Sequence, residues 1–193
     1  MTLSTKNLPF YLLATLLVAS VIINVLQARK IEQLRYVEAS LRADFQLQPN
    51  MTLPPIEAKS LDGKTVLFPY GDNELPSVIY VLSPTCKWCE NNQSNVEALF
   101  KGLQAKYRFI AISLEEDGLK SYSEKKGLSF SVYSGLPESI KYAYRLSGTP
   151  QTIVVSSRGE VMKNWNGAYI SNVKHEVESY FGITLPGLNE VKQ

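Results

Sequence analysis

Residues 78–89 read VIYVLSPTCKWC, an apolar run followed closely by two cysteines. The near-continuous apolar stretch 78–82 is typical of a strand at the centre of a sheet that is covered on both faces. Cys86 follows it at the start of the next expected helix, where free backbone N–H groups and the helix dipole stabilise a thiolate. Cys89 comes one helical turn later. This placement predicts that an accessible Cys86 exchanges disulfides first and that a more buried Cys89 then attacks the mixed disulfide.

The chain contains only these two cysteines, and their spacing argues against a purely structural role. A disulfide between residues three positions apart closes almost no chain, so it removes little entropy from the unfolded state. A structural zinc site needs four nitrogen or sulfur ligands, and the chain adds only the distant His175. We therefore expect no metal, and no cofactor beyond a redox-active Cys86–Cys89 disulfide.

The sequence around the motif predicts short strands that alternate with helices. Asp62-Gly63 is a turn signal between two β-rich stretches, which predicts an N-terminal hairpin. The order strand–helix–strand–helix, then a hairpin and a last helix, indicates an α/β sheet of mixed direction. The expected strands are 56–58, 65–68, 78–82, 109–113, 130–133, 152–155 and 161–165, and the expected helices are 86–107, 118–126, 138–144 and 171–181, the last capped by Ser171.

Ser147-Gly148-Thr149-Pro150 precedes the strand expected at residues 152–155. A proline at the start of a strand has two explanations. A cis bond would place backbone beside the active site, where an extended substrate could pair with it. An ordinary trans proline in a loop is the usual case for X–Pro bonds, and the local sequence by itself favours this second explanation.

Together, CxxC opening a helix after an apolar strand and a later Gly-Thr-Pro strand start resemble the thioredoxin superfamily. Over residues 51–182 the resemblance implies a thioredoxin fold, a mixed central sheet with helices on both faces, and thiol–disulfide exchange with protein partners. It also implies that Pro150 is a cis-proline and that Thr149 lies next to the cysteines, both in contact with substrate.

Further details are similar to the membrane-anchored TlpA-like branch of that superfamily. These are the hairpin with its Asp62-Gly63 turn, an insertion around residues 118–144 and a closing RGEV hairpin within residues 158–167. The SPTCxxC stretch also resembles the redox accessory protein of methylamine utilisation.

The chain departs from thioredoxin at the active-site motif. Three positions differ from the thioredoxin WCGPC motif: Thr85, Lys87 and Trp88. Tyr80 stands where thioredoxin has a buried aspartate, so the proton shuttle for Cys89 is unassigned. Glu90 is the nearest candidate carboxylate, and a solvated helix residue is the plainer interpretation of it.

The two residues between the cysteines suggest a specialised protein. The positive charge of Lys87 beside the thiolate should favour the reduced form and give the pair more oxidising power. Trp88 lies between two reactive cysteines near the surface, where it could be an apolar docking contact for a partner. These departures favour a dedicated partner over a general thioredoxin. A dedicated reductant or maturation factor is the expected role, and a pair that inserts disulfides is the open alternative.

Residues 8–26 form an uncharged run, LPFYLLATLLVASVIINVL, close to the ~20 residues that cross a bilayer as a helix. This predicts a single membrane anchor. A cleaved signal peptide is the alternative, because Lys6 supplies a charged n-region and small residues offer cleavage sites. The apolar run is longer than a typical signal-peptide core, which favours the anchor.

The charges that flank this segment indicate one location for the rest of the chain, and the dithiol pair indicates another. Arg29, Lys30 and Arg35 follow it, and the positive-inside rule, applied literally, would place the rest of the chain in the cytoplasm. A permanently anchored dithiol pair suits an extracytoplasmic, periplasmic location, where disulfides persist. We expect the second location.

A helical stalk should join the anchor to the globular part. Residues 28–47 lack glycine and proline, and four apolar residues recur at near-heptad spacing: Ile31, Leu34, Leu41 and Phe45. The segment is either a solvated stalk or a dimerising coiled coil, although it covers fewer than the three or four heptads that identify one. The expected organisation is an anchor at 1–27, a stalk at 28–50 and a thioredoxin-like domain at 51–193.

Charge and motif restrict the partners and the rival functions. A net charge of +2 with interspersed charges is too weak to suggest nucleic acid, so we expect no nucleic-acid partner. We expect protein thiols and disulfides, together with a membrane electron donor or acceptor. A peroxiredoxin would need Pro-x-x-x-Thr/Ser-x-x-Cys, and here Ser83 fits but Ile79 replaces the proline. A binding module without redox turnover is the rival from a different class.

Overall fold

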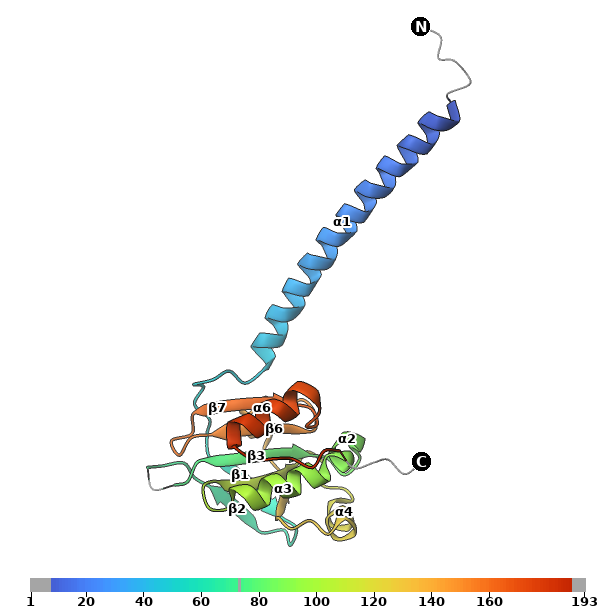
Figure 1. Ribbon diagram of the computed structural model, residues 1–193. Helices are drawn as coiled ribbons and strands as arrows, with labels where there is room; N and C mark the ends of the chain where they lie inside the picture. Colours follow the sequence, from blue (N-terminus) through green and yellow to red (C-terminus); the bar gives the residue numbers. More distant parts are fainter. Residues whose placement is uncertain (1–7, 73, 189–193) are drawn as a thin grey trace. The chain divides into compact units, whose positions relative to one another are not determined.

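The computed structural model describes residues 8–72 and 74–188 (Figure 1). The chain divides into two compact units, Met1–Gln46 and Leu47–Gln193. The second unit contains the whole sheet and both cysteines.

The first unit consists of helix α1 (Leu8–Phe45). The apolar run and the stalk, expected as two helical segments, form one continuous helix. Its stretch Tyr11–Arg35 is long and apolar enough to cross a membrane, and none of it is buried. Ile31 and Leu34 of the expected stalk are exposed. Lys6 and the side chains of Leu41 and Phe45 lie outside the described part of the chain.

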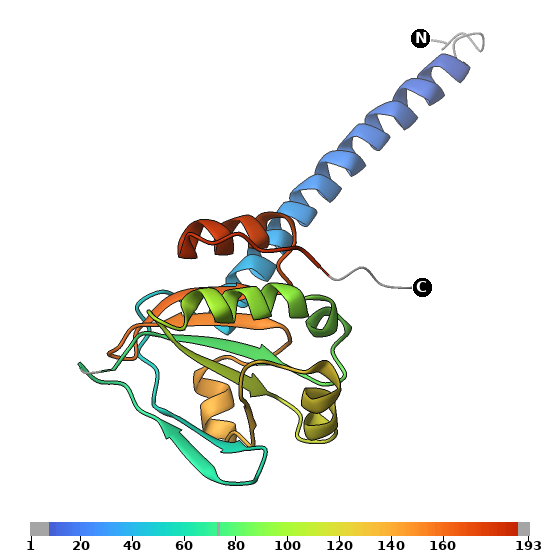
Figure 2. The same ribbon diagram turned by 60° about the horizontal axis from the view of Figure 1, so that its bottom comes forward.

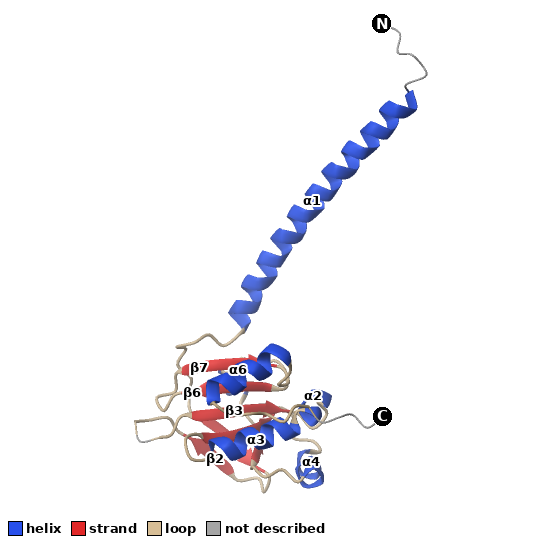
Figure 3. Ribbon diagram, viewed as in Figure 1, coloured by secondary structure: helices blue, strands red, loops and turns tan. Residues whose placement is uncertain are grey.

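The second unit is built on a single mixed sheet, drawn in red in Figure 3. Its strand order is β2-β1-β5-β4-β3-β6-β7. Parallel pairing joins β3 to β4 and β4 to β5, and all the other neighbours are antiparallel. The predicted α/β sheet of mixed direction is thus confirmed. Its strands are β1 (Ile56–Ser60), β2 (Thr65–Phe68), β3 (Ser77–Leu82), β4 (Arg108–Ser113), β5 (Val132–Ser134), β6 (Gln151–Val155) and β7 (Val161–Asn166).

The predicted N-terminal hairpin is also present. β1 and β2 pair in antiparallel register from Ile56 with Phe68 to Lys59 with Thr65. Gly63 in the turn has a φ of 81°, a left-handed conformation that costs glycine nothing because it has no Cβ.

Helices cover both faces of the sheet. Successive side chains of β3 point to opposite faces, so each face needs its own cover. Val78, Tyr80 and Leu82 belong to one core cluster, whereas Ile79 and Val81 belong to the other. Figure 2 shows α3 and α6 on one side of the sheet and α5 on the other. The helices of this unit are α2 (Lys87–Asn91), α3 (Gln93–Leu103), α4 (Leu119–Lys126), α5 (Glu138–Ala143) and α6 (Ser171–Phe181).

The single helix predicted at residues 86–107 is wrong. The structure has two helices that meet at Asn92, and the second ends at Leu103. The side chain of Asn92 turns into the core, where its Oδ1 accepts a hydrogen bond from the Tyr169 N–H at 3.0 Å. Tyr169, which lies outside both helices, therefore binds Asn92, the residue at which the predicted helix is interrupted.

Two smaller predictions also fail. Ser171 does not cap α6: the cap position is Ile170, and Ser171 has a left-handed φ of 45°. The strand expected at 130–133 is displaced to Val132–Ser134. Phe130 instead packs its ring against Phe109, with 5.3 Å between ring centroids, so the chain joins the ladder only after it.

Leu99 on α3 is fully buried in the first core cluster, and its truncation gives a test of that core. Leu99→Ala should lower the free energy of unfolding by about 2–5 kcal/mol, because it removes buried methyl groups and leaves a cavity. Leu67→Ala is the matched control, since Leu67 is 59% exposed on β2. Denaturant unfolding followed by the fluorescence of the buried Trp165 measures both, and equal losses would contradict this core.

Candidate active site

Cys86 lies in the bend between β3 and α2, where β3 ends. Its backbone is extended (φ −78°, ψ 107°), and its Sγ caps α2 by accepting a hydrogen bond from the Cys89 N–H at 3.1 Å. The Cys86 N–H donates to the Ser83 carbonyl at 3.1 Å, which closes the turn that carries the thiol. Cys86 is half-buried. The structure therefore places this thiol at a helix start and within reach of solvent.

Cys89 is on the inner side of α2 and is only 3% exposed. Burial is the largest cause of a Cys89 pKa raised to about 12, and the hydrogen bond and charge of Cys86 add to it. These contributions from Cys86 disappear once Cys86 is bound in a mixed disulfide. The pKa of Cys89 must then fall, so formation of the mixed disulfide itself prepares Cys89 to attack.

Thr149 and Pro150 lie beside Cys86, although they are far from it in the sequence. β6 begins at Gln151 and pairs antiparallel with β3, so the start of β6 meets the end of β3. The Cys86 thiol donates to the Thr149 carbonyl at an Sγ–O distance of 3.5 Å. The Thr149–Pro150 peptide bond is cis, as the resemblance implies and against the local expectation of a trans bond.

The residues that follow Cys86 divide into an exposed ring and a charged network. Trp88 is 53% exposed. Glu90 pairs with Lys87 at 3.0 Å and with Lys126 of α4 at 2.6 Å. These lysines, Lys126 first, lower the Glu90 pKa to about 2. A carboxylate held ionised in this way is a poor proton acceptor, which favours the surface interpretation of Glu90 over the proton shuttle.

Comparisons with known proteins place the fold. No protein-family profile and no curated protein matches the sequence. Among solved structures, the thioredoxin domain of a thiol-disulfide oxidoreductase from Bacteroides vulgatus matches with a TM-score of 0.54 at 17% identity, over 70% of this chain and 99% of that one. A peroxiredoxin-like protein from Aquifex aeolicus matches with a TM-score of 0.57 at 14% identity, over 71% of this chain and 87% of that one. A thioredoxin-like protein from Porphyromonas gingivalis matches with a TM-score of 0.53 at 21% identity, over 70% of this chain and 92% of that one.

The chain has the thioredoxin fold. These neighbours do not single out the TlpA-like branch or the methylamine-utilisation protein, so both stay predictions. The peroxiredoxin motif gains no support from this chain, because Ile79 is fully buried in the middle of β3 and the Ser83 hydroxyl bonds to Thr85 at 2.8 Å.

The thioredoxin fold also brings Tyr122 of α4 to the cysteines, a residue that the sequence analysis missed. Its pKa is raised to about 12, first by burial and then by Cys89, Glu90 and Cys86. The phenol packs against the core cluster that contains Cys89, as Cys86 does. No sequence signal marks it, because α4 is distant from α2 in the sequence and meets it only through tertiary contacts such as the Lys126–Glu90 ion pair.

Glu115 is a second carboxylate that the sequence analysis missed, and it binds Thr85, the residue before Cys86. Glu115 accepts hydrogen bonds from the Thr85 hydroxyl at 3.0 and 3.1 Å. Both residues come just after strands, and because β3 and β4 are parallel their ends lie at the same edge of the sheet. The positions of Thr85 and Glu115 after two predicted strands could therefore have suggested this pairing from the sequence.

Asn92 fixes the far end of α2 within the thioredoxin fold. It is fully buried, and its Oδ1 accepts from the Tyr169 N–H at 3.0 Å and from the Asn95 side-chain amide at 2.9 Å. The Asn95 Oδ1 in turn accepts from the Gly187 N–H at 2.7 Å. The short helix that carries Cys89 is thus tied to the loop after β7 and to the C-terminal segment.

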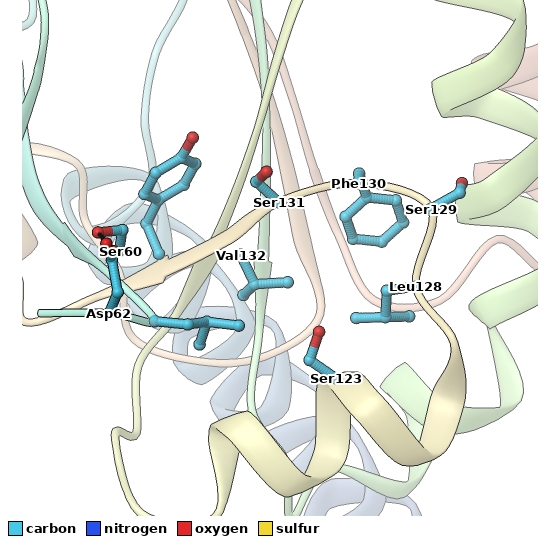
Figure 4. Close-up of a pocket in the computed structure, with 10 residues that line it drawn as sticks. Ser60, Asp62, Ser123, Leu128, Ser129, Phe130, Ser131 and Val132 are labelled. Carbon is cyan, nitrogen blue, oxygen red and sulfur yellow. Dashed lines mark hydrogen bonds between the residues drawn. The ribbon is translucent and has the colours of Figure 1, made fainter.

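A cavity of about 480 Å³ lies between the β1–β2 turn and α4 (Figure 4). Its lining includes the hydroxyl groups of Ser60, Ser123 and Ser131. None of the predicted site residues is among the residues that line it. The cysteine pair of this thioredoxin fold is therefore a separate site.

Proposed function

We propose that this protein is a membrane-anchored thiol–disulfide oxidoreductase that exchanges disulfides with a dedicated protein partner. The observation that carries the proposal is the asymmetry of the pair. Cys86 caps a helix at a half-buried position beside the Thr149 carbonyl, and Cys89 stands behind it in the core. One thiol is placed to meet a partner and the other to release it.

Exchange proceeds in two balanced steps when the protein acts as a reductant. The Cys86 thiolate attacks a partner disulfide, forms a mixed disulfide and releases one partner thiolate, which takes up a proton. Cys89 then loses its proton and attacks Cys86 Sγ, which forms the Cys86–Cys89 disulfide and releases the second partner thiol. Two electrons have passed from the cysteine pair to the partner, and a membrane electron donor must restore the dithiol.

The charge of Lys87 bears on the direction of electron flow. The sequence analysis expects this lysine to increase oxidising power, but its Nζ lies 3.0 Å from the Glu90 carboxylate. Because that carboxylate offsets the positive charge near the thiolate, we propose that the pair acts as a reductant or maturation factor.

Helix α1 supports the proposed anchor. Tyr11–Arg35 presents an apolar surface that is unburied throughout, and this surface is suited to a lipid environment. We place the cysteine pair on the extracytoplasmic side because disulfides persist there. Dimerisation through the stalk stays a prediction.

Disulfide exchange by the full-length chain in detergent micelles tests the proposed function. With dithiothreitol as the reductant, the protein should accelerate reduction of a disulfide-bonded reporter protein. The Cys86→Ser, Cys89→Ser double variant, which keeps the fold and lacks both thiols, should give the uncatalysed rate. Equal rates for the two proteins would contradict an oxidoreductase.

Trp88 provides a test of partner docking. Trp88→Ala should weaken turnover of a protein partner about tenfold, because an exposed indole between the cysteines can contribute an apolar contact worth about 1–2 kcal/mol. Reaction of Cys86 with a small disulfide should stay unchanged. Tyr142→Ala is the matched control, since Tyr142 is 73% exposed on α5. Equal losses with both substrates would show that Trp88 supports the thiol and does not dock a partner.

A further inference from the structure

Among the residues that the structure describes, two buried side-chain polar atoms have no hydrogen-bond partner: Tyr80 Oη and Asn92 Nδ2. A buried polar group without a partner is costly, and native proteins tolerate few of them. Tyr80 shares a core cluster with Cys89, and Asn92 follows Cys89 by three residues at the end of α2. This coincidence points to a role in the chemistry of that thiol.

Tyr80 reaches this place from the centre of the sheet. It pairs with Ala111 of β4 and Thr152 of β6, it is 2% exposed, and it shares a core cluster with Cys89. Its hydroxyl interacts electrostatically with Cys89 most strongly, and then with Tyr169 and Tyr122. The phenol therefore approaches the core cluster that holds the buried sulfur from the sheet side.

Asn92 orients this hydroxyl from the helix side. Its Oδ1 is occupied by the Tyr169 N–H and the Asn95 amide, so the amide cannot be flipped and its Nδ2 must face the other way. There it lies close enough to Tyr80 to act on the phenol, without a hydrogen bond of ordinary geometry. An amide donor facing Oη leaves the phenol hydrogen free to point elsewhere.

We propose that Tyr80 is the hydrogen-bond donor that stabilises the Cys89 thiolate during the second exchange step. This inference rests on the proposed function. In that step the Cys89 thiolate forms the bond to Cys86 Sγ, the bond between Cys86 and the partner breaks, and the departing partner thiolate takes up the proton that Cys89 lost. Tyr80 keeps its own proton throughout.

Tyr80 can act only as a donor, because burial, followed by the neighbouring Cys89 and Tyr169, raises its pKa well above 10. Other groups also face Cys89: the Cys86 thiol, the Thr149 hydroxyl and the Tyr122 phenol. Tyr122 is half-buried, where water can reach it, and the Tyr169 hydroxyl is engaged by Thr152 at 2.6 Å. Among the described residues, Tyr80 is thus the fully buried phenol of this cluster whose hydroxyl has no hydrogen-bond partner.

The experiment follows both exchange steps in the reduced full-length chain in detergent micelles. An aromatic disulfide that releases a coloured thiolate serves as the probe. Attack by Cys86 releases the first coloured thiolate, and attack by Cys89 on the mixed disulfide releases the second. Rapid mixing over a range of pH resolves the two phases for the wild type, Tyr80→Phe and Tyr122→Phe.

Tyr80→Phe should leave the first phase unchanged and slow the second between about tenfold and a hundredfold, the range for a lost hydrogen bond to a charged group. The pH profile of the second phase should move to higher pH, because Cys89 becomes harder to ionise. Tyr122→Phe should change the second phase less. The melting temperature of Tyr80→Phe should equal or exceed that of the wild type, because the change removes an unpaired buried hydroxyl.

Tyr144→Phe is the matched control. Tyr144 is also a buried tyrosine, but it lies in the other core cluster and donates to the Pro54 carbonyl at 2.6 Å. It should lose stability and keep both phases. A fluorinated tyrosine at position 80, a stronger donor of nearly the same shape, should speed the second phase.

Three outcomes would overturn the inference. If Tyr80→Phe keeps the wild-type second phase, Tyr80 does not stabilise Cys89, and the proposed function stands. If both phases slow equally, Tyr80 supports the fold alone. If the wild type releases only one coloured thiolate, Cys89 does not resolve the mixed disulfide, and the proposed function falls with this inference.

Discussion

Replacing Cys89 by serine is expected to arrest the protein on its partner as a covalent mixed disulfide. Cys86 keeps its place at the start of α2 and its contact with the Thr149 carbonyl, so the first attack still occurs. The second attack cannot occur, because serine is not a nucleophile for disulfides. Turnover should fall to the uncatalysed rate while a partner-linked species accumulates.

The opposite variant, Cys86→Ser, is the matched control, and it should form no mixed disulfide at all. Cys89 is 3% exposed, and burial, the largest cause of its raised pKa, is still present in this variant, so little of the thiol ionises at pH 7 and a partner cannot easily reach it. Non-reducing electrophoresis followed by mass spectrometry detects the linked species. A partner captured through Cys89 in the Cys86→Ser variant would reverse the roles assigned to the two thiols.

Asn92→Ala is expected to destabilise the second unit by about 2–4 kcal/mol, because two buried donors lose their acceptor. The wild-type Oδ1 accepts from the Tyr169 N–H and from the Asn95 amide, and neither donor can reach water. The same loss releases the end of the helix that carries Cys89. We therefore expect the second exchange step to slow together with the loss of stability.

Gln93→Ala is the matched control for Asn92→Ala. Gln93 is the next residue, and its amide donates a half-buried hydrogen bond to the Lys126 carbonyl at 2.8 Å. Its removal should cost only about 0.5–1.5 kcal/mol. Denaturant unfolding measured by Trp165 fluorescence compares the two variants. Equal costs would mean that the Asn92 network does not hold this part of the structure.

Features fixed by local sequence were predictable. The apolar run at residues 78–82 required a strand covered on both faces, and β3 is buried throughout. Cys86 follows that strand directly, so its position at a helix start came from the chain order alone. The hairpin around Gly63 was equally local, because its turn residues carry the signal.

Features that depend on a distant partner could not be predicted in this way. The interruption at Asn92 needs Tyr169, which comes from the loop after β7. Tyr122 reaches the cysteines because α4 packs beside α2, and the ion pair between Lys126 and Glu90 joins the same two helices. Periodicity shows which face of an element is apolar, but it does not show which polar side chain from another element will meet it.

A redox titration of the full-length chain in detergent micelles tests the central claim most directly. The protein is equilibrated in dithiothreitol and glutathione buffers that together cover this range of potentials, and the free thiols are then counted by alkylation and mass spectrometry. We predict one reversible two-electron transition of Cys86 and Cys89 between about −270 and −120 mV, nearer the lower value for a reductant. A pair that shows no reversible transition in this range would contradict an oxidoreductase and would indicate a thioredoxin fold used only for binding.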